Sequence, residues 1–211
     1  MKRILLIVTN VLLIAVSAHC FAKESFRGVT LSSLLKEMTS REALARWPQN
    51  EFNLKQMSSY DRMSISPDKP GWFANFDLST FLRVDSVKGR REFVMFDHSG
   101  PGAVVRFWMT FAGIHPGEGT MRIYIDNSDE PVVQGSPFEI LSGGMLAPEP
   151  LSSSVSKDYR YDRRGHNLYM PIPYAQRCII TYESSNVREQ NAGFGGENVY
   201  YNINYREYLP G

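Results

Sequence analysis

From about residue 81 onward, apolar and polar side chains alternate with the period of two that is typical of β-strands. In residues 120–126 this alternation puts Arg122 and Tyr124 on the polar side, which predicts a strand with one buried and one solvated face. Strands are predicted in the same way at residues 81–87, 92–97, 103–111, 120–126, 178–183 and 199–205. Because glycine and proline turns separate these short strands and little helix accompanies them, we expect a mainly β fold, a jelly-roll sandwich.

One region before these strands has helical spacing. Leucines recur three and four positions apart in residues 29–46, with Thr30 placed to cap the first turn. Thr39 and Glu42 have the spacing of a capping box, which predicts a second short helical turn. A short N-terminal helical segment is therefore expected to precede the sandwich.

The chain between this helical segment and the first predicted strand is rich in serine, proline, asparagine and aspartate. We expect residues 49–77 to be an irregular loop that aromatic side chains such as Trp72 hold in place. A long ordered loop of this kind is more often functional than a linker. The predicted organisation is residues 23–80 as helix and long aromatic loop, followed by residues 81–211 as one β jelly-roll module.

The first residues have the pattern of a secretory signal peptide. Two basic residues precede a short apolar run, and the segment before Lys23 supplies small residues at the two positions that a signal peptidase reads. We therefore expect residues 1–22 to be removed after Ala22 and the mature protein to be secreted or periplasmic. Retention as a membrane anchor is the alternative, but the run is short for a span of about 20 residues.

Charge and residue types exclude several classes of function. The full chain has a net charge of +1 at pH 7, and without the predicted signal peptide it has 21 basic and 22 acidic residues. We therefore expect no basic face of the kind that nucleic acids require. Cys178 is the only cysteine of the mature chain, so no internal disulfide can form, and its apolar surroundings predict a core position. His98, His115 and His166 lack metal-ligand spacing, and neither a phosphate-binding loop nor a nucleophile elbow is found, so neither a metal nor a cofactor is expected.

Residues of the kind that hold sugars gather in the long loop. A sugar ring offers an apolar face and a rim of hydroxyls, which a flat aromatic side chain and carboxylate, amide or guanidinium groups can bind. Asp61, Arg62 and Trp72 supply such groups and are candidate substrate-binding residues. The alternative is that Asp61 caps a turn and Trp72 anchors the loop, since aspartates in loops usually bond to nearby backbone.

Two further candidates lie outside that loop. Arg106 lies between apolar neighbours in a predicted central strand, and a buried arginine needs a partner. Asp97 is one candidate partner, which would make the arginine structural; contact with substrate is the alternative. His166 follows a loop rich in tyrosine and arginine, which either borders a pocket or is a solvated turn.

Six stretches in this order resemble one protein family, the former domain of unknown function 2961, which includes glycoside hydrolase family 172. They are residues 59–62, 71–77, 97–108, 122–126, 165–174 and 200–206. Each stretch is short, but the six together are specific and extend over nearly the whole mature chain. The six stretches resemble the N-terminal half of the proteins in this family.

This resemblance implies a jelly-roll fold with two such modules per subunit, and assembly of the complete family member into homo-oligomers. It also implies cleavage or rearrangement of α-linked furanosides, either fructofuranosides or D-arabinofuranosides, with retention, by one nucleophilic and one acid/base glutamate. Retention by this route requires two carboxyl groups about 5–5.5 Å apart. By the family's loop motifs, Asp61 and Trp72 are expected to approach the sugar pocket. Arg62, Arg106 and His166 are further candidates for that pocket.

The resemblance places both catalytic glutamates in the second module, beyond the strand at residues 199–205, and the sequence ends at Gly211. No catalytic residue is therefore assigned. Four glutamates of the chain are instead expected at the surface or at strand ends: Glu92, Glu118, Glu139 and Glu183. Three interpretations remain open: the N-terminal portion of a secreted furanosidase, inactive alone; a non-catalytic carbohydrate-binding module; and a truncated, non-functional reading frame.

Overall fold

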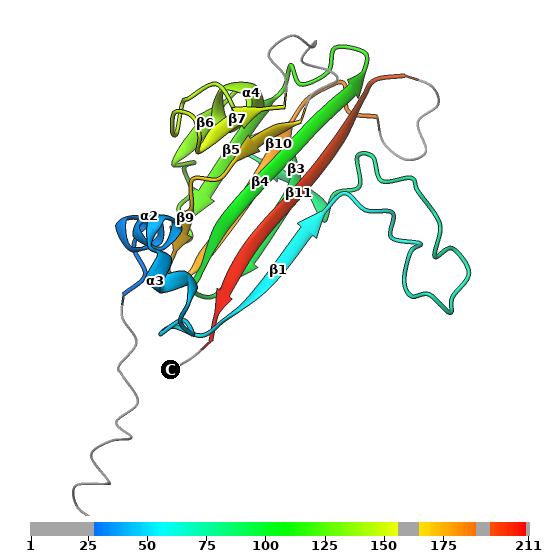
Figure 1. Ribbon diagram of the computed structural model, residues 1–211. Helices are drawn as coiled ribbons and strands as arrows, with labels where there is room; N and C mark the ends of the chain where they lie inside the picture. Colours follow the sequence, from blue (N-terminus) through cyan, green and yellow to red (C-terminus); the bar gives the residue numbers. More distant parts are fainter. Residues whose placement is uncertain (1–27, 156–164, 189–194, 210–211) are drawn as a thin grey trace, which may run out of the picture.

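In the computed structural model, residues 28–155, 165–188 and 195–209 are described. Two antiparallel β-sheets, A and B, pack face to face, so the predicted mainly β sandwich is confirmed (Figure 1). The chain passes repeatedly from one sheet to the other, which is the connectivity expected of a jelly roll. The predicted signal peptide, residues 1–22, lies outside the described residues.

The order of strands in sheet A is β1-β11-β4-β8-β7, and β9 pairs with the beginning of β4. Its strands are β1 (Phe52–Ser58), β4 (Gly102–Gly113), β7 (Ser152–Ser154), β8 (His166–Leu168), β9 (Ile172–Tyr174) and β11 (Glu197–Tyr208). The order in sheet B is β2-β3-β10-β5-β6. Its strands are β2 (Arg83–Val87), β3 (Arg90–Ser99), β5 (Thr120–Ile125), β6 (Val133–Gly135) and β10 (Arg177–Glu183). All six predicted strands are therefore present, with small shifts at their ends.

A large apolar cluster fills the space between the sheets. Phe107 of β4 and Ile203 of β11 face it from sheet A, and Cys178 and Ile180 of β10 face it from sheet B. Cys178 is a free, fully buried cysteine, and burial raises the pKa of its thiol. Its predicted core position is confirmed. At one end of the cluster, the short helix α4 (Pro137–Leu141) buries its last two residues.

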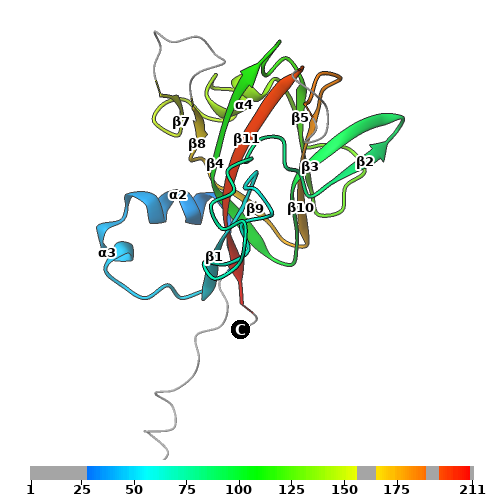
Figure 2. The same cartoon turned by 90° about the vertical axis from the view of Figure 1, so that its right-hand side faces the viewer.

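Two short helices, α2 (Leu31–Thr39) and α3 (Arg41–Leu44), precede the sandwich, as predicted. Thr30 caps α2 by accepting a hydrogen bond from the backbone amide of the third helical residue (3.1 Å), also as predicted. The predicted capping box at Thr39 is wrong by one residue, because Ser40 is the residue whose hydroxyl accepts a hydrogen bond from the Ala43 amide (3.2 Å). Helix α2 lies on the outer side of sheet A, where Leu34 is buried against β4 and β11 (Figure 2). In the described part of the chain, no helix is both long and apolar enough to cross a membrane.

The first part of the predicted loop is a strand. Residues 52–58 form β1, which pairs with β11 along its whole length, so the prediction of an irregular chain is wrong here. The side chains of β1 are mostly exposed; Met57 packs against the core between the sheets and Phe52 against the small cluster around Leu34, so the strand carries no clear burial pattern. Its conformation depends on backbone hydrogen bonds to β11. Residues 59–80 are irregular, as predicted, and project from the sandwich (Figure 1).

A polar cluster at the end of β11 stabilises the fold at neutral pH and loses this effect at acid pH. Glu207 forms an ion pair with Lys55 (2.7 Å), accepts a hydrogen bond from the Asn53 amide group (3.3 Å), and lies 3.3 Å from His98 Nε2. These partners, Lys55 first, lower the pKa of Glu207 to about 2. The pKa of an unfolded glutamate is about 4.3, so Glu207 stabilises the fold fully above about pH 5 and loses this effect as the pH falls toward about 2.

We therefore expect Glu207→Gln to destabilise the protein more at about pH 7 than at about pH 3. Urea unfolding at the two pH values measures this difference. Glu118, whose side chain is 69% exposed, supplies the control variant Glu118→Gln. Equal destabilisation by Glu207→Gln at both pH values would contradict the assignment.

Candidate functional site

The projecting loop carries three of the predicted sugar-binding residues. Asp61 is only 5% exposed, and both of its carboxylate oxygens are engaged. Oδ1 accepts a hydrogen bond from the Met63 amide (2.9 Å), and Oδ2 accepts one from the Phe76 amide (3.0 Å). The Asp61 amide in turn donates to Oδ1 of Asp77 (2.8 Å). The two aspartates thus tie the ends of the loop together, which is the structural alternative considered for Asp61.

Arg62, the other predicted polar residue of this loop, is also engaged locally, whereas Trp72 and Phe73 are exposed. Arg62 donates to the backbone carbonyls of Ser58 and Tyr60, and its guanidinium lies 3.9 Å from the centre of the Tyr60 ring. Trp72 is 39% exposed and Phe73 is 91% exposed. The polar residues therefore fix the shape of the loop, and Trp72 is the predicted residue there with a surface open to a ligand.

Arg106 lies half-buried on the outer face of sheet A. Its Nη1 and Nη2 atoms are 3.4 and 3.5 Å from Oδ1 of Asn204 and of Asn167. Asp97 is not its partner, because Asp97 belongs to β3 of the other sheet, where Arg177 binds it. The structural pairing considered for Arg106 is therefore wrong, and contact with a ligand stays a prediction.

His166 points to the opposite side of sheet A from Arg106. Its ring is fully buried in the interior, with Nδ1 2.7 Å from the Ser142 hydroxyl and the ring centre 4.7 Å from that of Phe138. The following residue, Asn167, is the one that shares a face with Arg106. The five predicted residues therefore belong to three different places: the projecting loop, the outer face of sheet A, and the interior.

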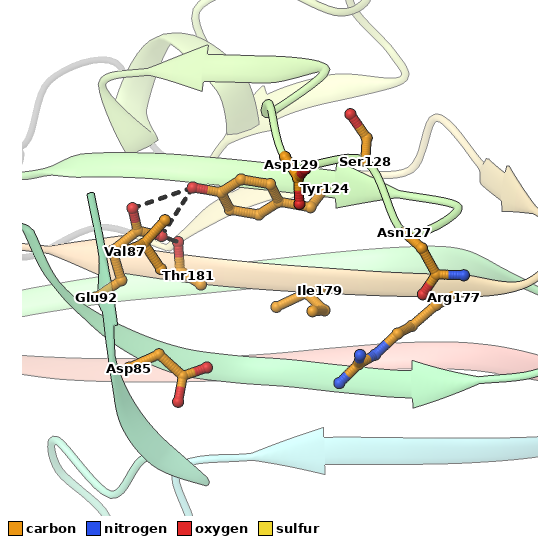
Figure 3. A pocket seen from close by; sticks show the side chains of 10 residues that line it. All are labelled: Asp85, Val87, Glu92, Tyr124, Asn127, Ser128, Asp129, Arg177, Ile179 and Thr181. Atoms are coloured by element: carbon orange, nitrogen blue, oxygen red, sulfur yellow. Dashed lines mark hydrogen bonds between the residues drawn. The ribbon is translucent and has the colours of Figure 1, made fainter.

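A hollow that none of the five residues lines lies on the outer face of sheet B (Figure 3). Its volume is about 250 Å³. Ile179 of β10 lies at its centre, between Asp85 of β2 and the turn at residues 127–129 that follows β5. Neighbouring residues of β10, Cys178 and Ile180, point the other way into the core. The hollow is thus open to solvent on the side of sheet B that faces away from sheet A.

A buried carboxylate forms one wall of this hollow. Glu92 was expected at the surface or at a strand end; it lies near the beginning of β3 and has no exposed surface, so a surface position is wrong. The Tyr124 hydroxyl donates to its carboxylate (3.0 Å), the Thr181 hydroxyl donates to Oε2 (2.7 Å), and Arg90 Nε donates to Oε1 (3.1 Å). These partners come from β3, β5 and β10, so the network joins three adjacent strands (Figure 3).

The same network corrects the predicted solvated face of β5. Arg122 and Tyr124 are only 5% and 8% exposed. Arg122 forms an ion pair with Glu183 (2.7 Å) and donates to Oε1 of Gln134 (3.0 Å). Burial, together with the hydrogen bond to the Glu92 carboxylate, raises the pKa of Tyr124. These polar side chains can be buried because hydrogen-bonding partners on the neighbouring strands satisfy them and shield them from solvent.

A second set of charges borders the hollow on the same face. Arg177 binds Asp97 through two hydrogen bonds of 2.8 Å, and Arg83 contacts both Asp97 (2.7 Å) and Asp85 (3.0 Å). Burial alone would raise the pKa of Asp97, but the two arginines outweigh it and lower that pKa. Asp97 is therefore held as an ionised carboxylate that is paired with both arginines.

This arrangement is suited to binding more than to acid–base catalysis. The Glu92 and Asp85 carboxylates that line the hollow already accept hydrogen bonds from side chains, including those of Arg90 and Arg83. Among the residues that the structure describes, no group of three or more His, Cys, Asp or Glu side chains could hold a metal ion. In the sequence, residues 122–126 were one family-like stretch on this face of sheet B. The residues that Arg122 and Tyr124 contact lie on other strands, so the stretch alone did not indicate the network.

The sequence matches the family model of the GH172 first beta-sandwich domain over residues 50–211. No curated protein gives a significant match to the chain. The matched range begins just before β1 and includes every strand of both sheets, in agreement with the two-sheet fold and with the predicted N-terminal half of the family. The chain therefore belongs to glycoside hydrolase family 172, and residues 50–211 are its first β-sandwich domain.

Proposed function

We propose that this chain is the N-terminal module of an exported glycoside hydrolase that acts on α-linked furanosides, either fructofuranosides or D-arabinofuranosides. Membership of the family over residues 50–211 is the observation that carries the proposal. The basic start, the apolar run and the small residues before Lys23 support export. The proposed partner is a furanoside-containing carbohydrate and not a nucleic acid, and the complete family member is proposed to form homo-oligomers.

The module by itself is proposed to be inactive. Hydrolysis with retention requires two carboxyl groups about 5–5.5 Å apart, one of which must be able to give up and take back a proton. In the hollow of sheet B, the carboxylates of Glu92 and Asp85 are already engaged by hydrogen bonds from Arg90 and Arg83. In the projecting loop, Asp61 is occupied by backbone amides. These engagements support a module that is inactive by itself.

Purified chain is therefore expected to release no fructose or arabinose above background from an α-D-fructofuranoside or an α-D-arabinofuranoside. Chromatography of the free sugars measures this, with a family member that contains both domains as the positive control. Sugar release in proportion to the amount of chain, in independent purifications, would contradict the proposal. The coding sequence beyond residue 211 gives a second test, because a following β-sandwich with a glutamate pair supports the proposed role as part of a larger enzyme.

A non-catalytic carbohydrate-binding module is the second candidate. The exposed aromatic side chains of the projecting loop, Trp72 and Phe73, favour it, since flat aromatic rings pack against the apolar faces of sugars. Saturable binding of a furanoside without cleavage, by a chain that is encoded without a second domain, would distinguish this candidate from the first.

A further inference from the structure

We propose that the hollow on the outer face of sheet B binds one neutral sugar residue and serves as a glycan-binding site. The choice of sugar as the ligand rests on the proposed function. The choice of this place rests on four observations: its size, its mixed apolar and polar lining, its balanced charge, and the fixed geometry of its rim.

The size and the floor suit a single ring. A volume of about 250 Å³ lies below the range of about 300–1,000 Å³ that is usual for pockets of drug-sized ligands. Ile179 and Val87 supply apolar surface within the hollow, and the ring of Tyr124 lies beside them (Figure 3). Apolar carbons in the floor can pack against the C–H face of a sugar, while its hydroxyls point to the rim.

The rim offers both donors and acceptors. Arg177 uses Nε and Nη2 to bind Asp97, and its fork has five N–H groups in all, so further donors remain. The Asn127 side chain donates to Gln176, and its carbonyl oxygen is an acceptor. Hydroxyl groups act as donor and acceptor at once, so a polyol is the kind of ligand that such a mixed rim fits.

Charge excludes the other simple ligand classes. Three carboxylates, those of Asp85, Glu92 and Asp129, line the hollow and disfavour an anion. Two of them are already paired with arginines, and Arg177 adds a positive charge, which disfavours a cation. A neutral ligand meets neither form of repulsion.

The rim is held in place before any ligand arrives. Asp126 and Asn127 adopt left-handed backbone angles, with φ of 55° and 62°. Oδ1 of Asp126 accepts hydrogen bonds from three successive backbone amides, those of residues 175–177, at 2.9, 2.7 and 3.4 Å. An ion pair between Lys88 and Glu130 joins the turn of the β2–β3 hairpin to the β5–β6 turn. Little conformational entropy is therefore lost when a ligand is bound.

Titration of the ¹⁵N-labelled chain with D-fructose, D-arabinose, D-glucose and methyl α-D-arabinofuranoside tests the proposal. At least one of these sugars is expected to shift the backbone amide signals of Tyr124, Asn127 and Ile179 in a saturable way. Ile179→Trp, which fills the hollow, is expected to abolish these shifts. Asn127→Gly removes one polar group and keeps the left-handed turn, and is expected to weaken binding roughly two- to tenfold.

Ser86→Ala is the matched control, because Ser86 is an exposed residue of β2 between Asp85 and Val87 and points to the other face. It is expected to leave the affinity unchanged. The amide spectrum of each variant reports whether it is folded, and Asn127→Gly keeps the test decisive if Ile179→Trp does not fold. Calcium chloride and sodium phosphate are expected to leave the three amide signals in place.

Three results would overturn the proposal. They are saturable shifts confined to the projecting loop or to the surroundings of Arg106, shifts that persist unchanged in the folded hollow variants, and the absence of saturation with every sugar. Binding of glucose alone at the three amides supports the sugar site and contradicts only the furanoside partner named under the proposed function. Release of sugar in the furanosidase assay, by contrast, would contradict the proposed inactivity of the module and leave the amide shifts unaffected, so the two proposals fail separately.

Discussion

Glu92→Ala is expected to lower the free energy of unfolding by about 3–5 kcal/mol. The carboxylate has no exposed surface and accepts hydrogen bonds from the side chains of Tyr124, Thr181 and Arg90. Alanine would leave the two hydroxyls without this acceptor and the neighbouring arginines without a negative charge. Because the partners lie on three strands, the loss should affect the whole of sheet B. Urea unfolding followed by circular dichroism measures it.

Two further variants separate charge from hydrogen bonding at this position. Glu92→Gln keeps an acceptor of the same shape and is expected to lose less stability than Glu92→Ala. Glu118→Ala removes an exposed glutamate and is expected to change the stability by no more than about 0.5 kcal/mol. A loss below about 1 kcal/mol for Glu92→Ala would show that the buried network contributes little.

Phe107→Ala should have an effect of similar size for a different reason. Phe107 is fully buried in the core and lies in register with Ile203 of β11 and Leu168 of β8. Truncation removes a large apolar side chain and leaves a cavity between the sheets, which costs about 3–5 kcal/mol for a buried phenylalanine. The same urea unfolding experiment measures the change.

The chain offers a matched control for this substitution. Phe73→Ala makes the same chemical change at a residue that is almost fully exposed, and is expected to alter the stability by no more than about 0.5 kcal/mol. Phe107→Leu keeps most of the apolar volume and is expected to lose less than Phe107→Ala. Similar losses at positions 73 and 107 would mean that the projecting loop packs in a way that its exposure does not indicate.

The two stability predictions concern different layers of the sandwich, the outer face of sheet B and the core between the two sheets. Glu92 lies on the outer face, among the residues that line the hollow, whereas Phe107 lies in the core between the sheets. A sandwich needs only its inner faces to be apolar, so the outer face can carry charged networks. On this outer face the networks bury polar groups and fix the walls of the hollow. Stability and the proposed binding site therefore share the same residues there.

The sequence was least informative about single polar residues. Asp61 and Arg62 have the residue types of a sugar site, but the nearest hydrogen-bonding groups are those of the loop itself. His166 is buried because β8 turns its side chain toward the interior, and Asn167 points outward instead. The role of such a residue depends on which face of a strand it occupies and on which strands lie beside it. The pattern of a single sequence predicts a strand, but it does not show which other strands lie beside it.

The sequence alone was sufficient for the sandwich class, the six main strands, the N-terminal helices, the core position of Cys178 and the family. Each of these follows from a local pattern or from the order of short motifs. The tertiary structure alone decided the strand β1, the burial of Glu92, Arg122 and Tyr124, and the hollow over Ile179. These features depend on pairing between strands that are distant along the chain, such as β3 with β10. Backbone pairing and buried polar networks leave no periodic trace in sequence, because their partners are set by the register of the sheet.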